Sequence, residues 1–158
     1  MTIQVGDRVP AATLNYINDG VKTISTDEIF KGNKVVLFSV PGAFTPTCSA
    51  KHLPGYVDQL QSFRDRGYKV ACMAVNDAFV MKAWAKDQDV PDDVMMLADG
   101  NGAFAQSLGL VMDATAFGMG TRSKRFALIA DDGVVKQLHV EAPGEFKVSG
   151  AEHVLSQL

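Results

Sequence analysis

Tryptophan and cysteine are scarce in this sequence, and neither sign of charge is in clear excess. With 15 Lys and Arg against 18 Asp and Glu, the formal net charge is −3, and no basic stripe is present that could neutralise phosphates. Nucleic acid is therefore not an expected partner. No apolar run approaches the roughly 18 residues of a membrane-spanning helix, and the N-terminus does not read as a secretory signal. We expect a soluble, cytoplasmic protein with no membrane partner.

The two cysteines, Cys48 and Cys72, are too few for a disulfide scaffold, and a chain of 158 residues can bury a core without one. The composition, 47% hydrophobic and 21% charged, is that of an ordinary globular protein. No repeat or linker divides the sequence, so we expect one domain over residues 1–158. In a reducing compartment each cysteine must then be explained by packing, metal binding or reactivity.

Hydrophobic periodicity predicts strands that alternate with helices along the first 110 residues. The expected strands are Ala12–Tyr16, Val21–Ile24, Lys34–Val40, Tyr68–Val75 and Val94–Ala98. The expected helices are a short one opened by a capping box at Ser25–Glu28, a long one over Pro46–Arg66 with a kink at Pro54-Gly55, one opened by Asn76 or Asp77, and one near Gly102–Leu108.

The last third of the chain predicts a β-hairpin followed by a helix. Strands Arg125–Ala130 and Val134–Val140 flank the turn sequence Asp131-Asp132-Gly133, and a capping box from Ser149 to Glu152 opens a helix over Ala151–Leu158. This order predicts an α/β, thioredoxin-like fold, with helices on both faces of a mixed central sheet and a C-terminal β-hairpin plus helix.

In open sheets of this kind, sites lie beyond the carboxyl ends of central strands, which is where the segment Pro41–Cys48 falls. Thr45 is a suitable N-cap and Pro46 a suitable first helical residue, so Cys48 lies in the first turn. The unpaired N–H groups and the dipole of a helix N-terminus favour an anion, and such positions lower a thiol pKa from about 8.5 into the range of about 3.5–7.5. This position favours a reactive thiol over the packing role that is commoner for a cytosolic cysteine.

Thr45-Pro46-Thr47-Cys48 stands where a disulfide oxidoreductase of this fold carries Cys-x-x-Cys, with threonine in place of the first sulfur. That disulfide cannot form. A single activated thiol beside a hydroxyl suits chemistry in which the cysteine is itself oxidised and then restored from elsewhere. Thr45 has a second interpretation, compatible with the first, as a plain N-cap.

The segment Pro41-Gly42-Ala43-Phe44-Thr45-Pro46-Thr47-Cys48 resembles the P-x-x-x-T-x-x-C motif of the peroxiredoxins. The following His52-Leu53-Pro54-Gly55-Tyr56 resembles the atypical type II subgroup, and the likeness continues through 75–80, 97–99 and 124–126 to the C-terminal 156–158. It covers essentially the whole chain.

The resemblance implies a role for each residue of the motif. Cys48 corresponds to the peroxidatic cysteine, Thr45 hydrogen-bonds the peroxide oxygens, and Pro41 and Thr47 complete the substrate-binding site. Arg125 polarises both the thiolate and the substrate, since a guanidinium stays charged and offers a fork of donors. Arg122 is a near neighbour in sequence that could be mistaken for it.

Cys72 lies within the apolar run YKVACMAV, which favours a buried packing role. Some plant-type relatives nevertheless have a cysteine here, and animal members resolve the sulfenic acid with a C-terminal cysteine that residues 145–158 do not contain. We therefore expect an external reductant, glutathione with glutaredoxin or thioredoxin, with Cys72 as the alternative resolving residue.

A metal site is not expected, although Cys48 and His52 are four residues apart on one helix face and could supply half of one. Two further ligands are missing, and His139 and His153 are isolated in the sequence. By the resemblance, the chemistry also needs no haem, flavin or other cofactor.

The predicted function is reduction of hydrogen peroxide and small alkyl hydroperoxides through a sulfenic acid. The alternative is a thioredoxin-fold redox sensor or holdase in which oxidation of Cys48 controls partner binding and turnover is incidental. Type II relatives often form dimers through loops near the active site, so a homodimer is expected, with Phe44, Phe79 and Phe117 as candidate contacts or core residues.

Overall fold

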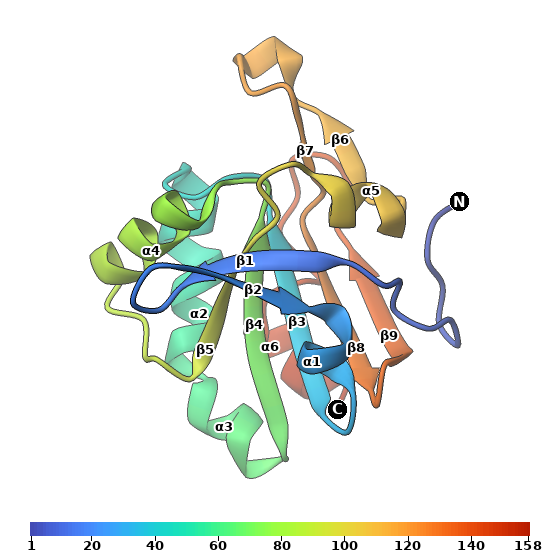
Figure 1. Cartoon of the computed structure of the whole chain (residues 1–158). Coiled ribbons are helices and arrows are strands. Elements are labelled where there is room, and N and C mark those ends of the chain that lie inside the picture. The colour runs from blue at the N-terminus through green and yellow to red at the C-terminus, as the bar shows by residue number, and fades with distance from the viewer.

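A seven-stranded mixed sheet lies at the centre of the structure, a computed structural model that describes residues 1–158 (Figure 1). The strand order is β2-β1-β5-β4-β3-β8-β9. β3 pairs parallel with β4 and antiparallel with β8, so the sheet is mixed as predicted. All seven strands were expected from the sequence: β1 Thr13–Ile17, β2 Val21–Ser25, β3 Lys34–Val40, β4 Tyr68–Ala74, β5 Val94–Ala98, β8 Phe126–Asp131 and β9 Val134–Val140.

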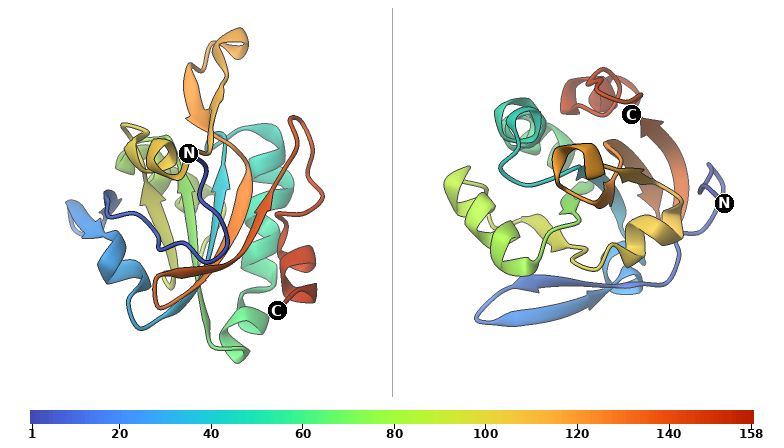
Figure 2. Two further views of the ribbon diagram at one scale, coloured as in Figure 1. Left: turned by 90° about the vertical axis from the view of Figure 1, so that its right-hand side faces the viewer. Right: turned by 90° about the horizontal axis from the view of Figure 1, so that it is seen from above.

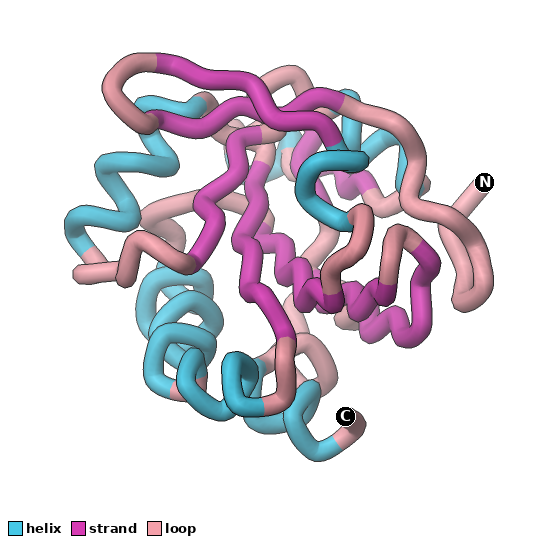
Figure 3. Tube along the Cα trace, turned by 60° about the horizontal axis from the view of Figure 1, so that its bottom comes forward, coloured by secondary structure: helices cyan, strands magenta, loops and turns pink.

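Helices cover both faces of this sheet, which confirms the predicted thioredoxin-like architecture (Figures 2 and 3). One buried cluster joins a sheet face to α2 Leu53–Asp58, α3 Leu60–Asp65, α4 Ala78–Asp87 and α6 Ala151–Ser156. A second cluster joins the other face to α1 Thr26–Phe30 and α5 Ala103–Leu108. None of the helices has both the length and the apolarity needed to cross a membrane.

The strands β3 and β4 are buried on both faces, as their continuous apolar sequences predict. Along β3, Phe38 faces the first cluster and Leu37 faces the second, and both are fully buried. Cys72 is the register partner of Phe38 on β4 and is also fully buried. The predicted burial of Cys72 inside the sheet is therefore confirmed.

Of the helix caps expected at Ser25, at Asp77 and at Ser149, two form and one does not. Ser25 and Glu28 make the reciprocal bonds of a capping box, and Asp77 accepts a hydrogen bond from the N–H of Val80 at the start of α4. The box from Ser149 to Glu152 is wrong, because Gly150 is the N-cap of α6 and makes no side-chain cap bond. The Ser149 hydroxyl donates instead to a buried carboxylate, which is a stronger acceptor.

The predicted long helix over Pro46–Arg66 is interrupted, although not where the kink was expected. A π-turn spans Cys48–His52, in which the N–H of Leu53 donates to the carbonyl of Cys48, and a second break lies at Gln59 between α2 and α3. Proline has no N–H and its ring crowds the carbonyl four residues before it, so the chain widens in the turn preceding Pro54.

A two-stranded ribbon was not predicted. It consists of β6 Val111–Asp113 and β7 Thr121–Ser123, joined through a 3₁₀ turn at Thr115–Phe117. The ribbon projects from the end of the molecule where β3 and β4 finish (Figure 1). Three-residue strands carry too little periodicity for a sequence pattern to indicate them.

Candidate active site

Cys48 and Arg125 are brought together by the antiparallel pairing of β3 with β8. Ser39, near the end of β3, is the register partner of Phe126, so the residue before β8 lies beside the segment that leaves β3. Arg125 Nη2 donates to Cys48 Sγ at 3.1 Å, and Cys48 is fully buried. A guanidinium in this position stabilises a thiolate by a charge-assisted hydrogen bond.

Arg122 does not contact the sulfur. Its Nε donates to the carbonyl of Met119 at 2.9 Å, and its Nη1 donates to the carbonyl of Val75 at 3.2 Å. The structure thus separates the two arginines that are close in sequence: Arg122 ties the base of the β6–β7 ribbon to the end of β4, and Arg125 faces Cys48.

His52 forms the next contact outward from Arg125. Arg125 Nη1 lies 2.8 Å from His52 Nδ1, and His52 Nε2 lies 3.1 Å from the carbonyl oxygen of Ser149. Because a guanidinium only donates and a carbonyl only accepts, the imidazole must be neutral with its proton on Nε2. Burial and the positive charge of Arg125 lower the pKa of His52 to about 3, in agreement with a neutral ring.

The contacts of His52 leave no nitrogen lone pair for a metal ion. Nδ1 accepts from Arg125, and Nε2 carries the proton donated to Ser149. The half-site of Cys48 and His52 that the sequence spacing suggested is therefore used for hydrogen bonding. No group of three or more His, Cys, Asp or Glu side chains is arranged to hold a metal.

Thr45 begins the helical segment through its backbone but does not cap it with its side chain. Its carbonyl accepts from the N–H of Ser49 at 3.0 Å, whereas its hydroxyl donates to the carbonyl of Gly42 at 2.7 Å. The predicted side-chain N-cap is thus wrong: the hydroxyl is directed back at the preceding turn, and no helix N–H donates to its oxygen. The oxygen of Thr45 keeps its lone pairs for another partner.

The turn between Pro41 and Thr47 is tightly held. The N–H of Ala43 donates to Asn76 Oδ1 at 2.9 Å, which ties the turn to the end of β4. A Cβ on the buried Gly42 would lie 3.1 Å from Met119 Cε, so glycine permits this close approach. Pro41 and Thr47 are half-buried at either end of the turn.

Phe44 lies in the same turn with an unusual backbone conformation. Its φ of 63° falls in the left-handed region, which a bulky residue rarely adopts, and its side chain is 52% exposed. The turn therefore directs a large apolar side chain outward, four residues before the buried Cys48.

Cys72 belongs to the same buried cluster as Cys48, and both thiols are unpaired. Burial, with a contribution from Cys48, raises the pKa of the Cys72 thiol well above its usual range. The pKa of Tyr56 is raised in the same way by burial and by Cys72. Cys72 thus presents little thiolate at neutral pH.

Several supporting residues were missed by the sequence analysis, all of them between the end of β9 and the start of α6. The carboxylate of Glu141 accepts hydrogen bonds from Ser149 Oγ and from backbone N–H groups of residues 147–149. The ring of Phe146 lies 5.0 Å from that of His52. Nothing in the sequence marks this loop, since its contacts with His52 span about 95 positions and no local pattern reports them.

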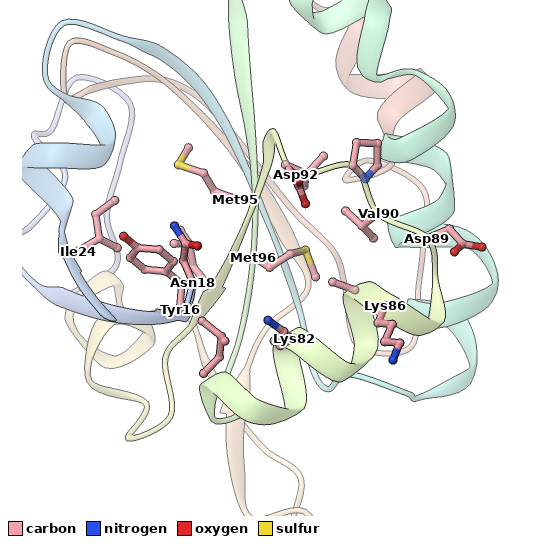
Figure 4. A pocket seen from close by; sticks show the side chains of 15 residues that line it. Tyr16, Asn18, Ile24, Lys82, Lys86, Asp89, Val90, Asp92, Met95 and Met96 are labelled. Carbon is pink, nitrogen blue, oxygen red and sulfur yellow. The ribbon is translucent and has the colours of Figure 1, made fainter. Parts of the chain in front are cut away.

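A separate groove of about 730 Å³ lies between the β1–β2 hairpin, β5 and α4 (Figure 4). Its lining includes Met95, Met96 and Lys82, and none of the residues around Cys48 contributes to it. The groove contains no cysteine or histidine, so it offers no nucleophile of the kind that the Cys48 site provides.

Known proteins resemble this chain over nearly its whole length. Residues 4–155 match the family model described as Redoxin. The chain is 49% identical to Peroxiredoxin-2E, chloroplastic, of Arabidopsis thaliana, covering 99% of this chain and 70% of that one. It is 45% identical to Peroxiredoxin-2B of the same plant, covering 99% and 98%. Reduced Prx3 of Vibrio vulnificus in complex with H2O2 superposes with a TM-score of 0.95 at 48% identity, covering 99% of both chains.

Proposed function

Because this chain belongs to the peroxiredoxin family and is a thiol peroxidase, we propose that it reduces hydrogen peroxide and small alkyl hydroperoxides through a sulfenic acid on Cys48. The observation that carries this proposal is the 3.1 Å contact from Arg125 Nη2 to Cys48 Sγ. A fixed positive charge at that distance favours the thiolate, which is the nucleophilic form of cysteine. It also lies where negative charge develops on a leaving oxygen.

The proposed oxidation is a displacement at oxygen. The Cys48 thiolate attacks one peroxide oxygen, a new S–O bond forms, and the O–O bond breaks with its electron pair going to the distal oxygen. That oxygen takes a proton and leaves as water or alcohol, while Cys48 is left as a sulfenic acid. The sulfur is oxidised by two electrons, and the peroxide is reduced by two.

Thr45 has a defined part in this step. Its hydroxyl proton is engaged by the carbonyl of Gly42, so its oxygen is oriented to accept a hydrogen bond from the O–H of a bound peroxide. Pro41 and Thr47 flank the turn, where they complete the binding site and exclude water. A buried sulfur behind this short turn suits small peroxides better than bulky ones.

We propose that the sulfenic acid is reduced by an external thiol, with glutathione and glutaredoxin as first choice and thioredoxin as second. One thiol displaces water to form a mixed disulfide with Cys48, and a second thiol releases the Cys48 thiolate. The raised pKa and full burial of Cys72 argue against its acting as the resolving cysteine. Because Cys48 is fully buried too, the turn that carries it must unwind before any partner thiol reaches it.

The Cys72→Ser variant tests this route. Peroxide consumption should stay near the wild-type rate with either glutathione plus glutaredoxin or thioredoxin, because Cys72 supplies no attacking thiolate. The two donors are assayed separately, so the preferred one is identified in the same experiment. Loss of turnover with both donors, in a folded variant whose Cys48 still oxidises, would make Cys72 the resolving residue.

We propose further that the protein works in the cytoplasm as a homodimer. The cytoplasm suits two unpaired thiols, since disulfides are disfavoured there. The dimer is suggested by three exposed phenylalanines, Phe44, Phe79 and Phe117, which are 52%, 69% and 78% exposed. Phe44 follows β3, Phe79 follows β4 at the start of α4, and Phe117 ends the 3₁₀ turn of the ribbon. The carboxyl ends of β3 and β4 and the ribbon lie at one end of the molecule (Figure 1).

A further inference from the structure

Arg125 is held without a carboxylate partner. No ion pair involves it, and its guanidinium contacts Cys48 Sγ, His52 Nδ1 and, at 5.8 Å from the centroid, the ring of Phe146. An arginine side chain has many rotamers, so its direction toward the sulfur depends on these neighbours. Two of the three, His52 and Phe146, are positioned by the loop between β9 and α6.

That loop, residues 142–149, is fixed by Glu141. One carboxylate oxygen accepts from the N–H groups of Lys147, Val148 and Ser149 at 2.9, 2.9 and 2.8 Å, and from the Ser149 hydroxyl at 2.7 Å. Glu141 is only 8% exposed, and its own N–H donates to the carbonyl of Arg125 at 3.0 Å. One residue therefore joins the backbone of Arg125 to the whole end of the loop.

The loop in turn presents one carbonyl to the site. The oxygen of Ser149 accepts from His52 Nε2 at 3.1 Å and from the Tyr56 hydroxyl at 2.7 Å. This acceptor places the imidazole proton on Nε2 and turns the Nδ1 lone pair toward Arg125. A shift of the Ser149 carbonyl would release the ring of His52, and with it the second contact of the guanidinium.

We propose that Glu141 is a positioning residue of the peroxidase reaction: it clamps the 142–149 loop so that Ser149 and Phe146 hold His52 and Arg125 directed at Cys48. This inference rests on the proposed role of Cys48 as the nucleophile. Glu141 touches neither the sulfur nor the arginine side chain, and acts through Ser149 and His52.

The direction in which the Cys48 thiolate fraction changes distinguishes this positioning role from a simple effect of the Glu141 charge. A carboxylate near the site disfavours a second anion, so removing its charge alone would favour the Cys48 thiolate. Releasing the clamp has the opposite result, because the guanidinium no longer stays within hydrogen-bond distance of Sγ. The Glu141→Gln variant keeps the shape and one acceptor oxygen, but a neutral amide oxygen is a weaker acceptor for these donors than a carboxylate, and the NH2 group replaces the second oxygen, which accepts from the N–H of Lys147.

The test compares Glu141→Gln with Glu145→Gln. Glu145 is an exposed residue of the same loop whose ion-pair partner is the Lys147 ammonium at 3.3 Å, so its variant changes charge equally without removing any hydrogen bond to Glu141. Reaction of the reduced protein with hydrogen peroxide is followed by stopped flow through Trp84, whose Nε1 donates to Ser49 Oγ beside Cys48. The pH profile of Cys48 alkylation by iodoacetamide gives the thiolate fraction.

For Glu141→Gln we expect the peroxide rate constant to fall about 10- to 100-fold and the alkylation midpoint to move to higher pH. Glu145→Gln should match the wild type in both. Should Glu141→Gln not fold, Ser149→Ala, which loses only the hydroxyl contact, should change both quantities in the same direction by less.

A folded Glu141→Gln protein with wild-type rate and profile, or with its midpoint moved to lower pH, would overturn the proposal. So would an unfolded Glu141→Gln protein together with an unchanged Ser149→Ala protein. Failure of the proposed function looks different, because turnover would then survive in Cys48→Ser, or the wild type would stop after one equivalent of peroxide.

Discussion

At the scale of single residues, two arginines three positions apart have different partners and should have different effects. Arg125→Ala removes the donor that contacts Cys48 Sγ, so the rate constant for peroxide should fall about 10²-fold or more. Arg122→Ala removes only bonds to the carbonyls of Met119 and Val75, so its effect should be a modest loss of stability. Single-turnover oxidation of each reduced variant measures its rate constant for peroxide. A rate that falls in Arg122→Ala and not in Arg125→Ala would show that Arg122 is the catalytic arginine.

His52 gives the protein a pH-dependent stability. Its pKa is lowered from 6.5 to about 3 by burial and by Arg125, so between these values the unfolded chain binds a proton that the folded protein does not. The free energy of unfolding should therefore fall as the pH drops through this window, by up to about 1.4 kcal/mol per pH unit from this group. The lowered pKa values of His139 and Glu141 act in the same direction.

Urea unfolding of the wild type and of His52→Gln at pH 7, 6 and 5, at one protein concentration, measures this contribution. His139 and Glu141 are unchanged in the variant, so the difference between the two slopes belongs to His52. The variant should show the shallower dependence on pH. Equal slopes would mean that His52 takes up a proton as readily in the folded protein as in the unfolded chain, which would contradict its buried, neutral state.

At the scale of elements, the sequence predicted the regular strands and helices well because their signals are local. The apolar run of β3 and the Ser25–Glu28 capping box depend on neighbouring residues alone. The failed caps have hydrogen-bond partners that only the folded backbone brings within reach. Ser149 does not cap α6 because Glu141, eight positions earlier, takes its hydroxyl, and the Thr45 hydroxyl turns back to Gly42.

The same distinction applies to the site. Cys48, Thr45 and Arg125 were identified by a motif and a resemblance, whereas the 142–149 loop was not, since only the fold brings it to His52. The π-turn at Cys48–His52 is an intermediate case. Pro54 predicts an irregularity in the helix, but the position of the widened turn depends on how the helix fits between β3 and α6.

At the scale of the whole molecule, the exposed phenylalanines at the active-site end predict self-association. Phe79→Glu should convert the proposed homodimer into monomer in sedimentation or light-scattering measurements, because a charge would be buried in the apolar contact. Val21→Glu is the matched control, an exposed apolar residue of the β1–β2 hairpin that is 49% exposed. A wild type that is monomeric at micromolar concentration, or a Phe79→Glu protein that stays dimeric, would contradict the prediction.

The central claim is that Cys48 is the residue that turns over peroxide. Its most direct test is steady-state peroxide consumption by the wild type and by Cys48→Ser, each with glutathione plus glutaredoxin and with thioredoxin. The wild type should consume many equivalents of peroxide per chain, and Cys48→Ser should consume none above background, since an alcohol supplies almost no nucleophilic anion at neutral pH. Turnover that persists in Cys48→Ser, or a wild type that stops after one equivalent in the presence of both donors, would contradict the account.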